Sequence, residues 1–306
     1  MQISLKNIIP NYDKWEKIIY INKGLSSDKK FFLQSKTQKK YIIRISKVKE
    51  LNNKINEYNA VKKIKKLNFI QKFLGYGICE NKEFMYSIYS WLQGENLEEK
   101  IFKLTKRKQY ELGFQAGKKL RKIHTLTITD TNYNFIKEIK EKVNISKKEY
   151  VKNKYKIKNE KIIWNFINKN LYLLDKREKC FLHGDFHIGN IILNKDKELG
   201  FIDLNWFRYG DPYKDFVKLV YVSRMLSVNF SIGQINGYFD NKVPEIFFKV
   251  LALYTAINVH FSILWSSKLE KKELNKDLKR IQKVYNDYSG FKLIIPKWYT
   301  KPNDNL

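Results

Sequence analysis

One segment of the chain, 182–215, holds most of the side chains that could do chemistry, and its pattern leaves few folds open. It reads LHGDFHIGNIILNKDKELGFIDLNWFRYGDPYKD and lies between stretches with helical patterns. Two β-type runs within it, 191–194 and 200–204, flank the polar turn 195–198. We therefore predict a β-hairpin that presents polar side chains at its open end.

A carboxylate and an amide are expected to meet at the open end of this hairpin. Strand pairing centred near Lys197 places Ile191 opposite Asp203, with Asn190 beside it. Oxygen ligands of this kind suit Mg²⁺, which takes one or two carboxylates together with phosphate oxygens and water. Asp185, in the loop before the hairpin, could orient a hydroxyl group and accept its proton. For each residue alone, capping of a turn is the simpler explanation, and only the combination indicates chemistry.

The first part of the chain, 1–91, is rich in strands and is predicted to be a separate lobe. The runs 31–34 and 41–45 surround a polar turn and predict a hairpin, and 83–89 predicts a further strand. Apolar residues at three- and four-residue steps predict a helix between them: Leu51, Ile55, Tyr58, Val61 and Ile64.

The second part, 92–306, has mainly helical patterns. A stripe from Leu112 to Ile123 predicts a helix that leads into His124, which we interpret as a core or interhelix histidine. The lysine-rich stretch 137–161 shows few core-forming residues, and we expect a solvated helix, a mobile insertion or a lid. The whole pattern predicts an α+β chain with a small β-rich N-terminal lobe and a larger, mostly helical C-terminal lobe.

The charge balance is strongly positive, with 60 Lys and Arg against 31 Asp and Glu, a net +29. An acidic partner such as nucleic acid, nucleotide or anionic lipid would explain it. A chain rich in Lys, Ile and Asn whose lysines are simply solvated would explain it too. No basic block coincides with a nucleic-acid motif, which argues against a nucleic-acid partner.

Cysteine content and apolar runs exclude other classes. Cys79 and Cys180 lie about a hundred residues apart, so neither a disulfide framework nor a zinc site is expected. The N-terminus has no apolar core of a signal peptide. The longest apolar stretch, 250–265, is interrupted by polar residues and falls short of the roughly 20 residues that span a bilayer. We expect a cytoplasmic protein with no membrane partner.

The order of these groups resembles a known family. The motif H-G-D-x-x-x-x-N at 183–190, followed by F-I-D at 201–203 and G-D-P-x-x-D at 210–215, is similar to the catalytic and metal-binding segment of aminoglycoside phosphotransferases. The resemblance extends from about residue 23 to 298 and implies a bilobal protein-kinase-like fold. It implies that Asp185 is the catalytic base and that Asn190 and Asp203 bind Mg²⁺. His183 would structure the loop, and Asp211 and Asp215 would brace it.

The resemblance also implies a nucleotide site in the first lobe. Kinase-like folds hold the α- and β-phosphates with a basic residue on the third strand, paired with a glutamate of the next helix. Arg44 and Glu57 occupy these places, although the family more often has lysine on the strand. Ser26 and Ser27 stand in the place of the loop that covers the nucleotide, but G-x-G-x-x-G is missing and a simple turn explains them equally well. Residues 86–91 match the hinge.

The activity implied is that of a small-molecule kinase that uses Mg²⁺ and ATP or GTP, with an aminoglycoside antibiotic as acceptor and resistance as the outcome. An aminoglycoside is a polycation, which a +29 chain repels at long range, so its pocket would need carboxylates. Four candidates are Asp240, Glu245, Glu270 and Glu273, while Asn205, Trp206 and Arg208 would border the acceptor.

Acceptors of the macrolide, choline or homoserine type remain alternatives, as does an inactive kinase-like protein that binds an acidic partner such as RNA. The sequence leaves the choice between ATP and GTP and the oligomeric state open.

Overall fold

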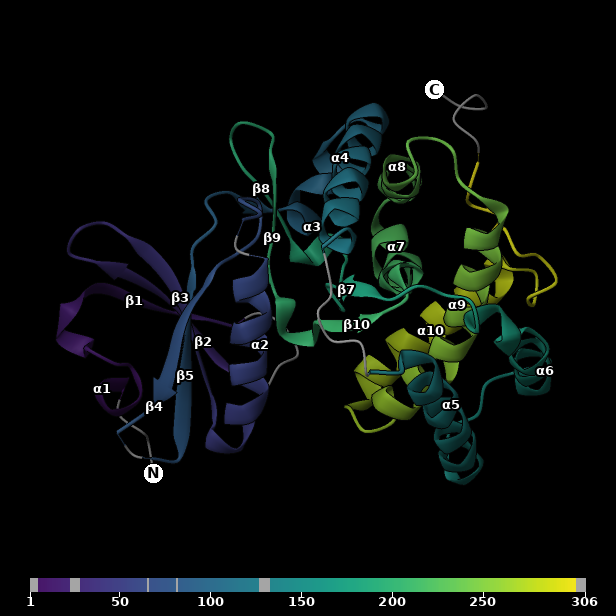
Figure 1. Cartoon of the computed structure of the whole chain (residues 1–306), viewed down its shortest axis with the longest axis horizontal. Coiled ribbons are helices and arrows are strands. Elements are labelled where there is room, and N and C mark those ends of the chain that lie inside the picture. The colour runs from purple at the N-terminus through teal and green to yellow at the C-terminus, as the bar shows by residue number, and fades with distance from the viewer. Residues whose placement is uncertain (1–4, 23–27, 65, 81, 127–132, 301–306) are drawn as a thin grey trace. The chain divides into compact units, whose positions relative to one another are not determined.

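The chain divides into two compact units in a computed structural model that describes residues 5–22, 28–64, 66–80, 82–126 and 133–300 (Figure 1). The first unit comprises Met1–Glu95 and Ile191–Phe207, and the second Asn96–Asn190 and Arg208–Leu306. The segment 191–207, which the sequence placed with the helical part, thus belongs with the strand-rich unit.

An antiparallel sheet of five strands forms the first unit, in the order β1-β2-β3-β5-β4. The strands are β1 (Trp15–Ile21), β2 (Lys29–Ser35), β3 (Lys40–Lys47), β4 (Phe73–Ile78) and β5 (Phe84–Ser90). The predicted hairpin is the β2–β3 pair, and the predicted third run is β5. Because β3 is the central strand, Arg44 lies opposite Lys30 on one side and Ser87 on the other.

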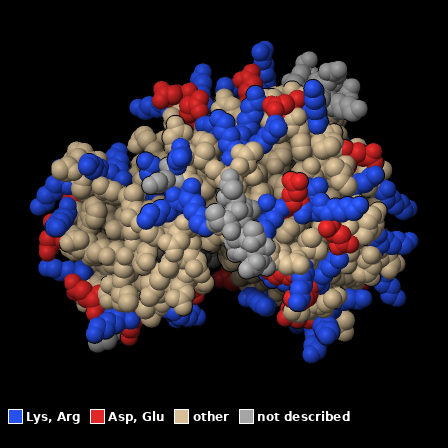
Figure 2. Space-filling model, in the orientation of Figure 1, with Lys and Arg blue, Asp and Glu red and all other residues tan. Residues whose placement is uncertain are grey.

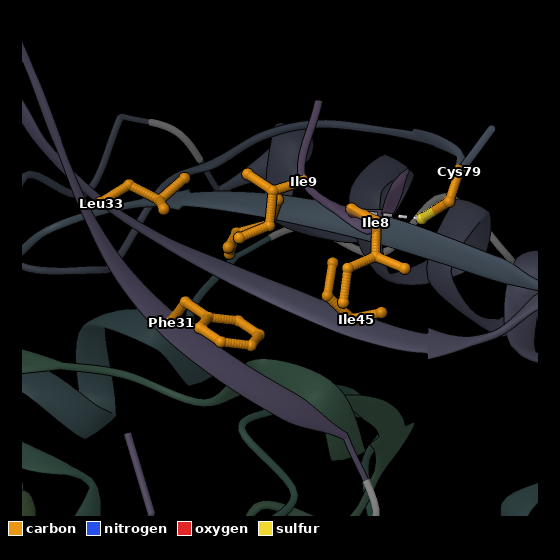
Figure 3. Packing of buried hydrophobic residues seen from close by; sticks show 7 residues of the cluster. Ile8, Ile9, Phe31, Leu33, Ile45 and Cys79 are labelled. Atoms are coloured by element: carbon orange, nitrogen blue, oxygen red, sulfur yellow. Dashed lines mark hydrogen bonds between the residues drawn. The ribbon is translucent and has the colours of Figure 1, made fainter. Parts of the chain in front are cut away.

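The alternation of the strands gives the sheet one apolar face, which carries a core cluster (Figure 3). Phe31 and Leu33 of β2 and Ile45 of β3 meet Ile8 of the short helix α1 (Leu5–Ile8) there. Cys79 completes the cluster and donates a hydrogen bond from Sγ to the Ile8 carbonyl at 3.3 Å. A 3₁₀ turn, Tyr12–Lys14, leads from this cluster into β1. Arg44 alternates with Ile43 and Ile45 and therefore belongs to the opposite face of the sheet.

The predicted helix is α2 (Leu51–Lys63), which follows the 3₁₀ turn Val48–Glu50 and packs against β4. Its buried side chains include two polar ones, Lys54 and Glu57, beside Ala60 and Val61. A helix face that buries charged residues is unusual, because a charge in the interior needs a partner.

The predicted second hairpin exists as β8 (Ile191–Leu193) and β9 (Leu199–Phe201), but with another register. Ile191 lies opposite Phe201, so the prediction that it faces Asp203 was wrong by two residues. The centre of the hairpin lies at Asp196, one residue earlier than the predicted Lys197. The Phe201 amide donates to the Phe69 carbonyl at 2.7 Å, and its carbonyl accepts from Gln71 at 2.9 Å, which fixes β9 within the first unit. Asp203 follows the ladder with a left-handed φ of 67° and precedes the 3₁₀ turn Leu204–Trp206.

The second unit is mainly helical. Its helices are α3 (Leu97–Lys100), α4 (Lys106–His124), α5 (Phe135–Lys152), α6 (Glu160–Asn170), α7 (Arg224–Leu226), α8 (Val228–Tyr238), α9 (Glu245–Ser266) and α10 (Lys271–Asp287). Single turns lie at Ile101–Lys103, Leu171–Leu174, Ile188–Asn190, Pro212–Phe216 and, as a π-turn, Leu219–Ser223. Two short strands, β7 (Cys180–Leu182) and β10 (Arg208–Gly210), pair antiparallel. The two-residue strand β6 (Glu95–Asn96) lies at the boundary of the two units.

Two glycine pairs let α4 and α8 lie side by side (Figure 1). A Cβ atom added at Gly113 or Gly117 of α4 would overlap a backbone oxygen of α8. The same holds for Gly233 and Gly237 of α8 against the backbone of α4. The two helices can approach this closely only because these four positions carry no side chain. Any larger residue there must push the backbones apart.

The lysine-rich stretch is part of the folded unit, so the expectation of few core-forming residues there was wrong. Helix α5 buries a stripe at helical spacing and contacts α9. The buried positions are Phe135, Ile139, Val143, Ser146 and Tyr150. The lysines occupy the remaining positions of the helix, which is why a composition count concealed the stripe.

Helix α9 is longer than the apolar stretch read from the sequence. Over its 22 residues it is long and apolar enough to cross a membrane by composition, but 72% of the apolar window is buried inside the protein, as in a core helix. On the face in view in Figure 2, Lys and Arg side chains are spread widely and do not form one block. This distribution favours solvated lysines as the explanation of the net charge.

Candidate functional site

The loop 183–190 follows β7 and is held in the second unit by one buried carboxylate. Asp215 accepts hydrogen bonds from the amides of His183 (2.8 Å) and Gly184 (2.9 Å). Gly184 has φ +84°, a conformation that glycine adopts without strain. His124, buried as expected, approaches the same carboxylate with Nε2 at 3.1 Å. Burial alone would raise the pKa of Asp215, but its hydrogen bond and charge interaction with His124 lower it, so the brace stays ionised.

Asp185 is mostly buried and surrounded by donors. Nζ of Lys218 lies 3.0 Å from Oδ1, and Nε2 of His187 lies 3.6 Å from Oδ2. Asn190 donates from Nδ2 to the Asp185 carbonyl at 2.9 Å and to Oδ2 at 3.2 Å. Burial opposes ionisation, yet the interaction with His187 and the charge of Lys218 outweigh it and hold the pKa of Asp185 well below its usual range. The carboxylate is therefore ready to accept a hydrogen bond from a hydroxyl group at neutral pH.

Asn190 is fixed so that its amide oxygen is turned away from Asp185. Both of the contacts just described use Nδ2, and the backbone amide of Asn190 donates to His187 at 2.9 Å. Two residues earlier, Ile188 donates its backbone amide to Ser223 Oγ at 3.0 Å. The amide oxygen, which is the atom a hard cation takes, is not used in these bonds.

In the first unit, Arg44 and Asp203 form an ion pair with Nη1–Oδ1 and Nη2–Oδ2 distances of 3.2 Å each. The guanidinium also lies over the ring of Tyr89, 5.3 Å from its centroid. Burial would lower the pKa of Arg44, but the charge of Asp203 raises it. Arg44 is only 5% exposed, so Asp203 compensates the charge of a guanidinium that is largely shielded from solvent.

Glu57 lies in the predicted helix, but its contacts differ from the expected pairing. Within the described part of the chain it makes no ion pair with Arg44; it accepts from Lys54 at 3.1 Å and from the Tyr89 hydroxyl at 2.8 Å. Lys54 also donates to Oδ1 of Asn205 at 3.0 Å. Asn205 in turn donates to Oδ1 of Asp203 at 2.6 Å. The two terminal nitrogens of a guanidinium can bind both oxygens of one carboxylate. For Arg44 on β3 this carboxylate is that of Asp203 and not that of Glu57.

Sequence reasoning missed Lys54 and Lys218. Lys54 precedes Glu57 by three residues, a spacing that puts both on one helix face, and this was the available signal. Lys218 lies three residues after Asp215 in a lysine-rich chain, and nothing in its spacing sets it apart. Asn205 was predicted to border the acceptor, and the structure places it beside Asp203.

Two of the predicted residues carry oxygen atoms of the kind that Mg²⁺ binds. Asp203 provides a carboxylate and Asn190 an amide oxygen, and among the described residues no cluster of three or more His, Cys, Asp or Glu could hold a metal. Mg²⁺ needs few protein ligands, because phosphate oxygens and water complete its shell. Asp203 belongs to the first unit, whereas Asp185 and Asn190 belong to the second. Ser26 and Ser27 lie outside the described residues.

The sequence profile of the phosphotransferase enzyme family matches residues 17–246, three quarters of the chain. The chain belongs to this family. It is thus an enzyme that transfers phosphate to a hydroxyl group, as the resemblance of 183–215 implied. No curated protein sequence matches the chain significantly.

Solved structures of phosphotransferases share the fold. The ADP-bound aminoglycoside phosphotransferase APH(2'')-Ib is 19% identical and has a TM-score of 0.64, with 89% of this chain and 93% of that chain covered. The GDP complex of aminoglycoside 2'-phosphotransferase-IIIa is 12% identical (TM-score 0.65; 89% and 93%). A choline/ethanolamine kinase family protein from Mesorhizobium loti is 13% identical (TM-score 0.67; 94% and 95%). The predicted kinase-like fold is confirmed.

Most carboxylates predicted to attract a cationic acceptor are occupied by the chain's own cations. Asp240 pairs with Arg121 at 2.6 Å and with Lys118 at 3.7 Å. Glu245 pairs with Lys249 at 2.7 Å, and Glu273 pairs with Lys276 at 2.6 Å. Asp211, expected to brace the loop, instead holds Arg177 through contacts of 2.9 and 3.0 Å, and the bracing of 183–184 falls to Asp215.

Proposed function

We propose that this phosphotransferase is a Mg²⁺-dependent kinase that moves the γ-phosphoryl group of ATP or GTP to a hydroxyl group of a small molecule. The observation that carries the proposal is the environment of Asp185, an ionised and largely buried carboxylate held by Lys218, His187 and Asn190. Related folds bound to ADP and to GDP support either nucleotide as donor. Like most such kinases, the enzyme would act in the cytoplasm.

Asp185 would bind the acceptor hydroxyl and receive its proton. The hydroxyl oxygen forms a bond to the γ-phosphorus, the bond to the β–γ bridging oxygen breaks, and the nucleoside diphosphate leaves. A carboxylate with a depressed pKa is a weak base, so it orients the hydroxyl first and takes the proton late in the reaction. This order suits a phosphoryl transfer with a loose transition state, in which positioning matters most.

The other site residues would hold the donor. Asn190 and Asp203 would bind Mg²⁺, which when bound neutralises charge on the β- and γ-phosphates. The guanidinium of Arg44 would bind the phosphates. The buried pair Lys54 and Glu57 would stabilise the part of α2 that packs in the first unit. Ser26 and Ser27 would cover the nucleotide from the loop that precedes β2.

An aminoglycoside is the first candidate acceptor, and phosphorylation would make the enzyme a determinant of antibiotic resistance. The support is the similarity in fold to aminoglycoside phosphotransferases across most of both chains. Kinases of the choline type share the fold as well, so fold alone does not choose the acceptor.

A second candidate is an acceptor that is not a polycation, of the macrolide or homoserine type. The ammonium group of Lys218 lies 3.0 Å from the carboxylate that would bind the hydroxyl, and a polycation would meet its charge there. The pairing of Asp240, Glu245 and Glu273 with lysines and an arginine of the same unit points the same way.

A turnover assay tests the proposal. The enzyme is incubated with Mg²⁺ and ATP or GTP, and nucleoside diphosphate release is followed with an aminoglycoside, a macrolide, choline or homoserine. We expect acceptor-dependent release that disappears without Mg²⁺. If nucleoside diphosphate is released without any acceptor, and at the same rate in Asp185→Asn as in the wild type, the role of Asp185 is contradicted. No release, with RNA binding that weakens steeply with salt, would instead favour the inactive RNA-binding alternative.

A further inference from the structure

The second unit contains a basic cavity apart from the 183–190 loop. Its volume is about 510 Å³. It lies between the end of α4, the turn after Leu171–Leu174, the start of the 3₁₀ turn Pro212–Phe216, and the end of α8. The residues that matter for its chemistry are Arg121, Lys176, Arg177, Tyr213, Tyr238 and Lys242. A volume of this size is in the range of sites for small organic ligands.

Four cations and a single carboxylate, Glu178, line the cavity. Two of the cations have carboxylate partners that do not line the cavity: Arg177 is held by the buried Asp211, and Arg121 by the exposed Asp240. The ammonium groups of Lys176 and Lys242 make no ion pair with any carboxylate in the part of the chain that the structure describes. The cavity therefore offers two ammonium groups that are free to bind an anion, and a guanidinium that is already fixed in place.

Three aromatic rings and two prolines form the rest of the wall: Tyr213, Tyr238, Phe239, Pro212 and Pro244. The guanidinium of Arg177 lies 4.0 Å from the centroid of the Tyr213 ring, and Tyr213 packs edge-on against Phe239 at 5.7 Å. A rigid guanidinium beside flexible lysines is a combination that binds phosphate oxygens well. The aromatic wall and the volume leave room for an organic group beside the phosphate. The chemistry thus fits a phosphate monoester or diphosphate of a small molecule.

Tyr238 connects the cavity to the catalytic loop. Its hydroxyl lies 2.9 Å from Nδ1 of His124, whose Nε2 lies 3.1 Å from Asp215. Asp215 accepts from the amides of His183 and Gly184, which precede Asp185. His124 and Asp215 are both buried, so the chain of hydrogen bonds lies in a low dielectric, where each bond depends on the others.

We propose that this cavity binds a small phosphate-bearing anion and that its occupancy changes the stability of the 183–185 loop through Tyr238, His124 and Asp215. An anion beside Tyr238 alters the field at its hydroxyl and thereby its bond to His124. The site is thus an effector site that is separate from the phosphoryl transfer itself. It does not depend on which acceptor the enzyme uses.

Binding of inorganic pyrophosphate, measured by calorimetry without divalent ions, tests the site. The variant Lys176→Gln/Lys242→Gln removes the two unpaired ammonium groups. We expect its affinity for pyrophosphate to fall about tenfold, because two modest charge-assisted contacts are lost. The control Lys161→Gln/Lys169→Gln removes the same charge from the exposed side of α6 and should keep wild-type affinity. No binding to the wild type, or equal weakening in both variants, would overturn the proposal.

Hydrogen exchange tests the connection without any activity assay. In the wild type, pyrophosphate should change the exchange rate of the peptide that contains His183 and Gly184. In Tyr238→Phe, which keeps the ring and loses the hydroxyl, pyrophosphate should still bind but leave that rate unchanged. An equal response of both proteins would refute the role of Tyr238, and a response absent from the wild type would refute the effector role. A failed kinase assay would affect neither result.

Discussion

Arg44 and Asp203 are 159 positions apart in the sequence, and their side chains form an ion pair with two contacts of 3.2 Å. Arg44 thus engages both oxygens of the carboxylate that we assign to Mg²⁺. Asn205 adds a third donor to Oδ1 at 2.6 Å. A metal ion at Asp203 must share these oxygens with Arg44, so nucleotide and metal binding should loosen the pair.

The variant Asp203→Asn tests both roles of this carboxylate. Loss of the metal ligand should lower Mg²⁺-dependent turnover by about a thousandfold or more, the equivalent of several kcal/mol of charge stabilisation. Arg44 would keep its burial without a charged partner, which should cost about 2 kcal/mol of folding stability because Asp203 is partly exposed. Turnover and thermal unfolding are measured together. Asp196→Asn, in the exposed hairpin turn, is the control; near-normal turnover in Asp203→Asn would refute the metal assignment.

The variant Asp185→Asn separates nucleotide binding from chemistry. It keeps the size of the side chain and removes the proton acceptor, so turnover should fall by about 10²–10⁴ while nucleotide affinity changes little. Affinity is measured by calorimetry and turnover by diphosphate release. Asp175→Asn removes a carboxylate whose ion pair with Lys140 is exposed, and should leave both quantities unchanged. Equal turnover in the two variants would exclude Asp185 as the base.

The pattern of 183–215 was enough to predict the fold class and the family, because the order of its carboxylates, amides and short strands is specific. The strands and α2 followed from two- and three-to-four-residue periodicity, which burial enforces. What the sequence could not provide was the partner of each charged side chain. Arg44 was expected beside Glu57, and the alternation of β3 placed it on the correct face, but no local rule decides between Glu57 and Asp203.

The same limit explains the errors in the helical unit. Lysine is so frequent in α5 that composition alone does not reveal its buried apolar residues. These residues are buried because the helix packs against α9, which is a tertiary contact. The α4–α8 glycines have a four-residue spacing that is visible in the sequence, but which helix meets which is a tertiary fact. The hairpin register was wrong by two residues because the centre of the turn lies one residue earlier than predicted, and turn geometry fixes the register of a hairpin.

The variant Lys218→Met tests whether this lysine sets the ionisation of Asp185. With the ammonium group gone, the pKa of Asp185 should rise from its depressed value. The carboxylate is active when ionised, so activity is lost as pH falls through that pKa, and the acid limb of the kcat/KM profile should move to higher pH. Lys249→Met, which removes an exposed partner of Glu245, is the control.

The same variant distinguishes the two acceptor classes. A polycationic acceptor should show a lower KM in Lys218→Met, because a repulsive charge has been removed, and an anionic acceptor a higher one. An acid limb at the wild-type position would show that Lys218 does not control Asp185.

A pair of glycine variants tests the α4–α8 contact. In Gly117→Ala the new methyl group would overlap the backbone oxygen of Gln234, so the helices must separate. Overpacking of this kind costs about 1–3 kcal/mol and outweighs the better helix propensity of alanine. Gly75→Ala is the matched control, because a Cβ there meets nothing within 4 Å. Chemical unfolding should show a lower midpoint for Gly117→Ala alone, and equal midpoints would mean that the contact tolerates a side chain.

His260 of α9 should make folding stability depend on pH. Its ring is fully buried, stacks on Trp164 at 3.8 Å and meets the edge of Tyr150 at 5.0 Å. Neither ring nitrogen has a hydrogen-bond partner in the described part of the chain. Burial lowers the pKa of His260 from 6.5 to about 4. Between these values the unfolded chain binds the proton and the folded protein does not, so stability falls as pH drops below about 6.5.

The variant His260→Leu removes this dependence. Between about pH 7.5 and pH 5 the wild type should lose about 2 kcal/mol more folding stability than the variant. The reason is that the imidazole becomes protonated in the unfolded chain over this range but stays neutral in the folded protein. Denaturant unfolding at both pH values measures the loss for each protein. Because the comparison is between two proteins, the contributions of the other titrating groups cancel. If both proteins lose the same stability, the imidazole is not held neutral by its burial against Trp164 and Tyr150.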